Sequence, residues 1–225
     1  QTDGIASVWT LNYYDEDGRM QETIKQNHLG GIDRVINAYS FNDLLESSTL
    51  THIANGVTTQ IVNGFKYDHM DRKLATTENI NNQGLVFLNR FTFNEIGQLK
   101  KKQLHSKDNS TSYLHYSDYE YNERGWIKKM GSDEFSVQLN YNDADGVVPQ
   151  FNGNISNQLW GHGRITPNIF RYGYHRLNRL TNAASTGLGE SINYDVMGNI
   201  TSLSRDGFGT NNYDMYEGNK LKHIY

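Results

Sequence analysis

Short stretches in which apolar and polar residues alternate run along the whole chain, separated by turns rich in Asp, Asn and Gly. In one such stretch, Ile192 and Tyr194 flank a polar residue, and this period of two places both on one face of a strand. Asp195 follows and is expected to accept hydrogen bonds from turn amides. Gly198 is expected to supply the positive φ of a tight turn. The stretch therefore predicts a strand end, a turn and, from Ile200, the next strand.

This pattern recurs along the sequence. Each copy begins with an aromatic residue followed by Asp, Asn or His, and most continue through Gly and a polar residue to Leu, Ile or Met. Apart from one longer gap, the spacing fits two strands of about 6–9 residues and two turns, so each repeat is predicted to be one β-hairpin. Aligned on the aromatic residue, the copies begin at Tyr14, Phe41, Tyr67, Phe93, Tyr121, Tyr174 and Tyr194, with an irregular copy at Tyr141 and a terminal variant at Tyr216.

The segments between these turns are also typical of strands. Gly56–Val62 is rich in β-branched residues and lies between Asn55-Gly56 and Asn63-Gly64, which are hairpin-turn signals. Asp33–Ala38 is short and favours a strand over a helix. Longer loops are expected over residues 106–112 and 183–190. The predicted fold class is all-β, with consecutive hairpins forming one continuous, twisted antiparallel sheet in a single region, 1–225.

Composition supports an ordered sheet and narrows the function classes. Aromatic residues make up 12% of the 225 residues, with 15 Tyr and 9 Phe, which is unlike a disordered chain. The net charge of -4 and the lack of a basic stripe argue against nucleic-acid binding. The absence of Cys excludes disulfides and thiol catalysis. No apolar run reaches the length of a membrane helix. The chain begins with Gln1 and ends in the strand-like Leu221–Tyr225, which suggests a piece of a longer polypeptide or a processed product.

Motifs that carry chemistry are weak. His162 lies in the dense cluster Trp160–Arg164, which is interpreted as a turn, with a binding loop as the alternative. The acidic turns before Gly18 and Gly146 do not fit a calcium loop, because the first and twelfth positions lack the required carboxylates. Nucleotide-binding and nucleophile-elbow motifs are also missing. The sequence therefore predicts no catalytic, cofactor-binding or metal-binding residue.

The repeated motif Tyr-Asp-x-x-Gly-Arg/Asn-Leu/Ile resembles the YD repeat of the Rhs (rearrangement hot spot) proteins, and the resemblance extends from Tyr14 to about Leu221. Residues 151–156, Trp160 and residues 172–180 resemble the run that leads into the Rhs-associated core of secreted bacterial Rhs proteins. The resemblance implies a spiralling sheet that forms the wall of a hollow shell around a C-terminal toxin. The Asp-Pro-x-Gly motif that the family uses for self-cleavage is absent, so no catalytic residue is inherited.

The expected function is structural and non-enzymatic: a wall segment of a secreted or cell-surface Rhs-like shell or repeat-built assembly. Its expected partners are flanking repeats of the same polypeptide, or further copies of the chain, joined through open edge strands. An enclosed toxin domain is a further expected partner, and neither nucleic acid nor a membrane span is expected. The alternative is a carbohydrate-binding module that stacks sugars on exposed rings, with glycans as partners. The candidate stacking residues are Tyr119, Tyr121, Trp126, Trp160 and Tyr172. An enzyme that cleaves glycans is the third possibility, because two of the many carboxylates could lie close together.

Overall fold

The computed structural model describes residues 8–108, 111–143, 146–213 and 215–223, and these residues form strands, turns and loops without a helix. The chain divides into two units, Gln1–Tyr116 and Ser117–Tyr225, each described by itself below. Strands β1 to β17 belong to a 17-stranded sheet, and β18 and β19 pair as a separate hairpin. The predicted all-β fold of consecutive antiparallel hairpins is confirmed. The expectation of a single region over 1–225 stays a prediction.

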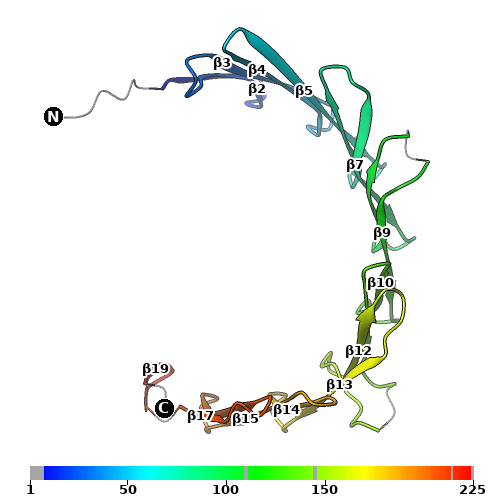
Figure 1. The fold of residues 1–225 in the computed structure, drawn as a ribbon, viewed down its shortest axis with the longest axis vertical. Helices are drawn as coiled ribbons and strands as arrows, with labels where there is room; N and C mark the ends of the chain where they lie inside the picture. Colours follow the sequence, from blue (N-terminus) through cyan, green and yellow to red (C-terminus); the bar gives the residue numbers. More distant parts are fainter. Residues whose placement is uncertain (1–7, 109–110, 144–145, 214, 224–225) are drawn as a thin grey trace, which may run out of the picture. The chain divides into compact units, whose positions relative to one another are not determined.

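In the first unit, each strand pairs antiparallel with the next along the chain from β1 to β8 (Figure 1). Strand β9 contains the boundary between the units. The bounds are β1 Thr10–Tyr14, β2 Met20–Gln26, β3 Ile32–Tyr39, β4 Leu45–Ala54, β5 Val57–Tyr67, β6 Lys73–Ile80, β7 Leu85–Phe93, β8 Leu99–Ser106 and β9 His115–Tyr121.

The second unit is also an antiparallel meander, with shorter strands. Each strand from β9 to β16 pairs antiparallel with its successor. The bounds are β10 Ile127–Ser132, β11 Phe135–Asn140, β12 Asn157–His162, β13 Asn168–Tyr174, β14 Leu180–Ala184, β15 Gly189–Tyr194, β16 Ile200–Arg205, β17 Thr210–Asn212, β18 Met215–Glu217 and β19 Lys220–His223.

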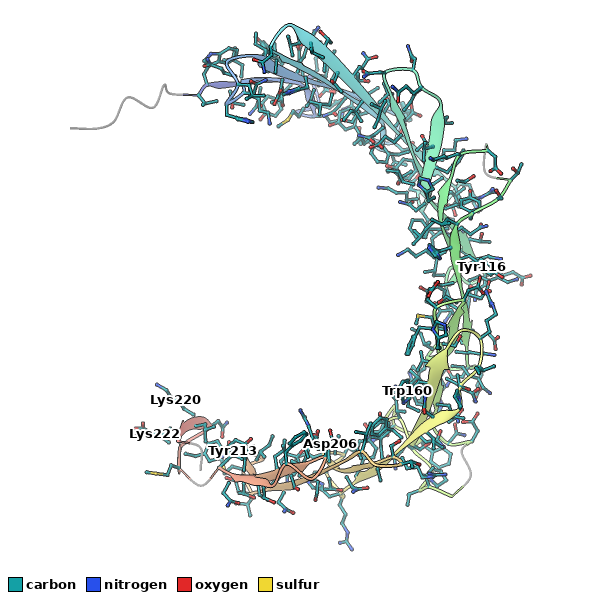
Figure 2. The ribbon with its side chains drawn as sticks, viewed as in Figure 1. Tyr116, Trp160, Asp206, Tyr213, Lys220 and Lys222 are labelled. Atoms are coloured by element: carbon teal, nitrogen blue, oxygen red, sulfur yellow. The ribbon has the colours of Figure 1, made fainter. Side chains whose placement is uncertain are left out.

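Within each unit the sheet is a single layer, and side chains project from both of its faces (Figure 2). The accessible surface of the chain is 15052 Å². A compact monomer of 25.8 kDa would expose about 10,500 Å². Few apolar side chains are therefore buried. Among the described residues they are Ala54, Ala75, Phe87, Tyr141, Ala183 and Ile192.

The two faces of the second unit differ in chemistry. Register places Tyr119 opposite Met130, Met130 opposite Val137, and Val137 opposite Trp160. Since paired residues share a face, these four side chains lie on one side, which we call the aromatic face. The alternate residues of β11, such as Gln138, belong to the opposite, polar face. In the first unit a comparable aliphatic row crosses one face, formed by Val35, Leu50, Ile61 and Ile80.

Two predicted turn assignments are wrong. The second copy starts at Tyr39, because Ser40 and Leu44 close its turn through a backbone hydrogen bond of 2.8 Å. Phe41 is instead fully exposed at the tip of that turn. The Asn63-Gly64 pair does not end a strand but lies inside β5. A Cβ atom on Gly64 would lie 2.6 Å from Oγ1 of Thr77, so the glycine permits a close approach between neighbouring strands.

The predicted long loops have mixed outcomes. The loop after β8 is confirmed, although residues 109–110 lie outside the described residues. Half of residues 183–190 lie in strands, and the connection between β14 and β15 is only four residues long, 185–188. The expected strand over Asp33–Ala38 and the Asn55-Gly56 hairpin are confirmed by β3, β4 and β5.

Candidate functional site

Within each unit the repeated turns lie at the same end of the strands. The turn after β5 shows how each is built. The carboxylate of Asp68 accepts hydrogen bonds from the backbone N–H groups of Met70, at 2.9 Å, and Arg72, at 3.0 Å. Its second oxygen accepts from Nε of Arg72 at 2.7 Å. Asp71 takes the glycine position and has a φ of 60°. The hydrogen bond from the Arg72 side chain lowers the pKa of Asp68 to about 2.

Other turns use the same scheme with different residues, most of which are chemically matched. We call the residue in the place of Asp68 the turn acceptor and the residue four positions later, in the place of Arg72, the turn partner. A carboxylate meets a guanidinium in some copies and an amide meets an amide in another. The pairs are Asp15–Arg19, Asp68–Arg72, Asn94–Gln98, His175–Arg179 and Asp195–Asn199. The predicted acceptor role of Asp195 and the positive φ of Gly198, 97°, are confirmed. Sequence reasoning missed the turn partner, although matched residues four positions apart were a readable signal.

The tyrosine that begins a turn fastens its hairpin to the preceding one. Its hydroxyl donates to the backbone carbonyl that follows the preceding turn, so the ring crosses from one hairpin to the next. The donor and acceptor pairs are Tyr39–Met20 at 3.1 Å, Tyr67–Leu45 at 3.0 Å, Tyr141–Ile127 at 2.8 Å, Tyr174–Ile155 at 2.9 Å, Tyr194–Leu180 at 2.7 Å and Tyr216–Ile200 at 2.7 Å. We call this contact the tyrosine latch. It includes Tyr141, so the irregular copy behaves as a repeat.

The turn partner also contacts the next hairpin. The guanidinium of Arg179 lies 4.7 Å from the ring centroid of Tyr194, within cation–π range. A Cβ atom on Gly198 would lie 3.0 Å from Nη1 of the same arginine. Arg72 repeats this arrangement with the next turn, at 4.7 Å from the ring of Phe93 and 2.9 Å from the Cβ position of Gly97. The turn glycine therefore provides both a backbone conformation and space for a cation.

The five candidate sugar-stacking residues lie in the second unit, and none is fully exposed. Tyr119, Trp160 and Tyr172 belong to the aromatic face by register. Tyr121 lies two residues after Tyr119 on β9 and therefore on the same face.

Two of the candidates pack against neighbouring rings. The ring of Trp126 packs 5.0 Å from the ring of Tyr141, and Tyr172 stacks 6.3 Å from Phe170. Burial raises the pKa of the Tyr172 hydroxyl. Binding of sugars by these rings stays a prediction.

The first unit holds a polar cluster that sequence reasoning did not single out. Nδ1 of His52 lies 2.5 Å from the carboxylate of Asp33, which also accepts from Nδ2 of Asn27 at 3.1 Å and pairs with Lys25 at 3.5 Å. The amide of Asn27 first, and His52 after it, lower the pKa of Asp33, against the opposing effect of burial. The members come from β2, β3 and β4 and from the turn after β2, so only strand register brings them together.

The predicted turn at Trp160–Arg164 is only partly correct, because Trp160, Gly161 and His162 end strand β12 and the turn comprises Gly163 and Arg164. Its Arg164 pairs with Asp133 at 2.9 Å and with Asp118 at 3.2 Å. The part of the chain that the structure describes contains no group of three or more side chains suited to hold a metal ion. None of its elements is a helix long and apolar enough to cross a membrane.

The best-defined hollows in each unit are shallow and are not enclosed clefts. The hollow of about 390 Å³ in the first unit is lined by residues that include Lys66, Phe87 and Phe93. In the second unit a hollow of about 290 Å³ lies beside Phe170 and Glu190. The carboxylate of Glu190 is paired with Arg205 at 2.5 Å.

Comparison with known proteins identifies the fold. No family model matches the chain. No curated protein matches it either. Among solved structures, the Photorhabdus luminescens Tc holotoxin pore with a substitution in TccC3 is similar, with 12% identity and a TM-score of 0.51 over 91% of this chain and 14% of that chain. The crystal structure of TcdB2–TccC3–Cdc42 matches at 11% identity and a TM-score of 0.41, over 91% of this chain and 13% of that chain.

At this identity the likeness establishes the fold alone, and this chain spans about a seventh of the length of the chains it matches. The sequence repeat and the fold agree. The hairpin architecture that the YD-repeat resemblance implies is present in both units, and the same turn recurs in each.

Proposed function

We propose that this YD-repeat chain is a structural, non-enzymatic segment in the wall of a secreted, toxin-associated shell. The observation that carries the proposal is the single-layer sheet, which leaves side chains on both faces without a second layer to cover them. A wall needs two such faces, whereas an autonomous globular domain buries one of them. The similarity to a fold in the Tc holotoxin pore supports a toxin-associated setting.

The difference between the faces supports the same role. In the second unit aromatic side chains such as Tyr119, Trp160 and Tyr172 lie on one face, while the other face mixes Ser, Asn and Gln with the apolar Leu159 and Ile169. A wall that separates an interior from solvent would use the two faces differently. The flanking repeats of the polypeptide would be its partners along the sheet, and an enclosed toxin domain its partner across one face.

The proposal is tested by chemical labelling of the two faces. Val137 and Gln138 are neighbours on β11 whose side chains project from opposite faces. The segment contains no natural cysteine, so Val137→Cys and Gln138→Cys each introduce a single thiol into it. The variants are made in the secreted full-length polypeptide and treated with a bulky, hydrophilic maleimide before and after denaturation.

A shell wall protects one of the two thiols until the protein is unfolded, while the other reacts at once. Equal reaction of both thiols in the folded polypeptide would show an open strip and contradict the proposal. A bound glycan would shield a thiol only when it is added, so labelling with and without oligosaccharide separates the carbohydrate-binding alternative.

A further inference from the structure

We propose that the hollow over Ala75 in the first unit binds a small organic anion, whose phosphate or carboxylate group is held by Lys66 and Arg72. The hollow has a volume of about 390 Å³, which lies within the range of small-molecule sites. Its lining comes from β5, β6 and β7 and from the turn after β5, all in the first unit. The inference goes beyond the proposed wall function and does not depend on it.

A small residue between two long cationic ones forms the hollow. Register places Ala75 of β6 between Lys66 of β5 and Arg90 of β7, so the three side chains share one face. Ala75 is 3% exposed and forms the floor. Neighbouring strands lie about 4.8 Å apart, so the two cationic side chains leave the sheet about 10 Å apart and line the hollow from opposite sides.

A β-bulge brings an aromatic ring to the same hollow. The register between β6 and β7 shifts where Thr77 pairs with Phe87 in place of Leu88. Phe87 and Arg90 are three residues apart and would project from opposite faces of a regular strand, yet both line the hollow. The other register shifts in the paired strands that the structure describes lie beside YD turns. This bulge therefore does not serve to close a turn.

The lining of the hollow has an excess of positive charge, although the whole chain has a net charge of -4. Its charged members are the cationic Lys66, Arg72 and Arg90 and the carboxylate of Asp68. That carboxylate is already paired with Arg72 at 2.6 Å. The ammonium group of Lys66 lies 5.6 Å from the ring centroid of Phe87, and no carboxylate among the described residues pairs with it. An anion in the hollow therefore meets an ammonium group without a competing carboxylate.

The apolar part of the lining indicates that the anion is organic. Phe87, Phe91 and Phe93 contribute to the lining. The guanidinium of Arg72 lies 4.7 Å from the ring centroid of Phe93, so a cation and an apolar ring are neighbours at the same hollow. An inorganic anion would leave the half-buried rings in contact with water, whereas a planar apolar group would cover them.

The repeat itself does not require this arrangement. Lys66 stands directly before the aromatic residue of its motif, and Ala75 stands three positions after the turn partner. In the other regular copies these two positions hold Tyr and Glu, Ala and Ser, Thr and Lys, Glu and Lys, Gly and Asn, or Asn and Ser. The lysine and the alanine are therefore departures from the repeat that meet at one hollow.

The test titrates the full chain with phenyl phosphate and follows the methyl NMR signal of Ala75 at the floor of the hollow. We expect a saturable shift of this signal. Inorganic phosphate lacks the ring and benzyl alcohol lacks the charge, so each should bind about tenfold more weakly at the same ionic strength. Binding to the variants is followed through the ring signals of phenyl phosphate, and an unchanged amide spectrum shows that each variant is folded.

Lys66→Gln should weaken binding about fivefold, because it removes the cation that has no carboxylate partner. Lys73→Gln is the matched control and should leave the affinity unchanged. The ammonium group of Lys73 also lies over a ring, at 4.7 Å from the centroid of Phe65, but Lys73 does not line the hollow.

Ala75→Leu provides a second variant, because it fills the hollow without changing a charge and should abolish binding. Ala183→Leu, at a buried alanine of the second unit, is its control. Absence of a saturable shift at millimolar phenyl phosphate, or equal losses in Lys66→Gln and Lys73→Gln, would overturn the proposal. Inorganic phosphate or benzyl alcohol that binds as tightly as phenyl phosphate would also overturn it.

Discussion

Tyr194 donates its hydroxyl hydrogen to the carbonyl of Leu180 at 2.7 Å. This bond joins β15 to β14, which belong to consecutive hairpins. The same ring lies beneath the guanidinium of Arg179. The aromatic residue of the YD motif therefore holds neighbouring repeats together, while its acidic residue closes the turn.

Tyr194→Phe removes the latch and keeps the ring. We expect local destabilisation of about 1 kcal/mol, because the carbonyl of Leu180 loses its partner in a half-buried position. The measurement is native-state amide exchange, which should accelerate about fivefold in β14 and β15. Tyr13→Phe, on the exposed strand β1, should leave exchange unchanged. Equal acceleration in both variants would show that the hydroxyl of Tyr194 contributes no specific bond.

The stability of the turn that contains Asp68 should depend on pH. The folded-state pKa of Asp68 is lowered from 3.8 to about 2, first by the side-chain hydrogen bond from Arg72. Because the pKa is lowered, the stabilising contribution of the ionised Asp68 carboxylate is complete above about pH 3.8 and is lost as the pH falls towards 2. Asp68→Asn should lower the melting temperature at pH 7, and its difference from the native chain should shrink towards pH 2.

Asp68→Ala is the companion variant. It removes the acceptor for the backbone N–H groups of Met70 and Arg72 as well, so it should lower the melting temperature further than Asp68→Asn at pH 7. If Asp68→Asn lowers the melting temperature as much at pH 2 as at pH 7, the ionised pair is not the cause of the decrease.

His175 is the least well matched turn acceptor. Nδ1 of His175 accepts from the N–H of Leu177 at 2.8 Å, and its Nε2 meets Nε–H of Arg179. A neutral imidazole has one acceptor nitrogen, so it cannot satisfy both donors. His175→Asp should raise stability by about 0.5–1 kcal/mol, because a carboxylate accepts from both donors. Thermal unfolding measures the gain. Arg176→Gln, which also lowers the net charge by one, should show none.

Gly198 should tolerate alanine less well than Gly207 does. Both have positive φ, 97° and 74°. A methyl group on Gly198 would press on Arg179, whereas nothing lies within 4 Å of that site on Gly207. Gly207→Ala should cost about 1–2 kcal/mol from backbone strain alone. Gly198→Ala should cost more, and urea unfolding should give the difference. Equal costs would mean that the arginine moves aside freely.

The turn acceptor and the turn glycine were predictable because their determinants lie within a few neighbouring residues. Asp195 and Gly198 have the predicted roles for this reason. The copy near Tyr39 was misplaced, since Phe41-Asn42 imitates the start of a repeat. Ser40 serves as the acceptor there and Asp43 adopts the positive φ of 61°, and neither residue is typical of its position.

Contacts between hairpins could not be predicted from the sequence. The tyrosine latch depends on strand register, which decides whether the hydroxyl of Tyr194 reaches Leu180 or a neighbour. The cluster of Asp33 and His52 likewise forms across β3 and β4 between residues that are 19 positions apart. The all-β fold and its hairpin repeat followed from local pattern, whereas the bonds between repeats required the folded sheet.

The paired contacts within and between turns have a consequence for how such chains lengthen over evolutionary time. A hairpin whose motif begins with Tyr carries its own acceptor and partner, a hydroxyl for the hairpin before it and a carbonyl for the hairpin after it. Duplication or deletion of such a hairpin therefore keeps these bonds matched at the new junction. A change of length within a hairpin separates residues such as Asp68 and Arg72 and leaves unmatched groups on both sides. Whole hairpins are thus the natural unit by which this sheet gains or loses length.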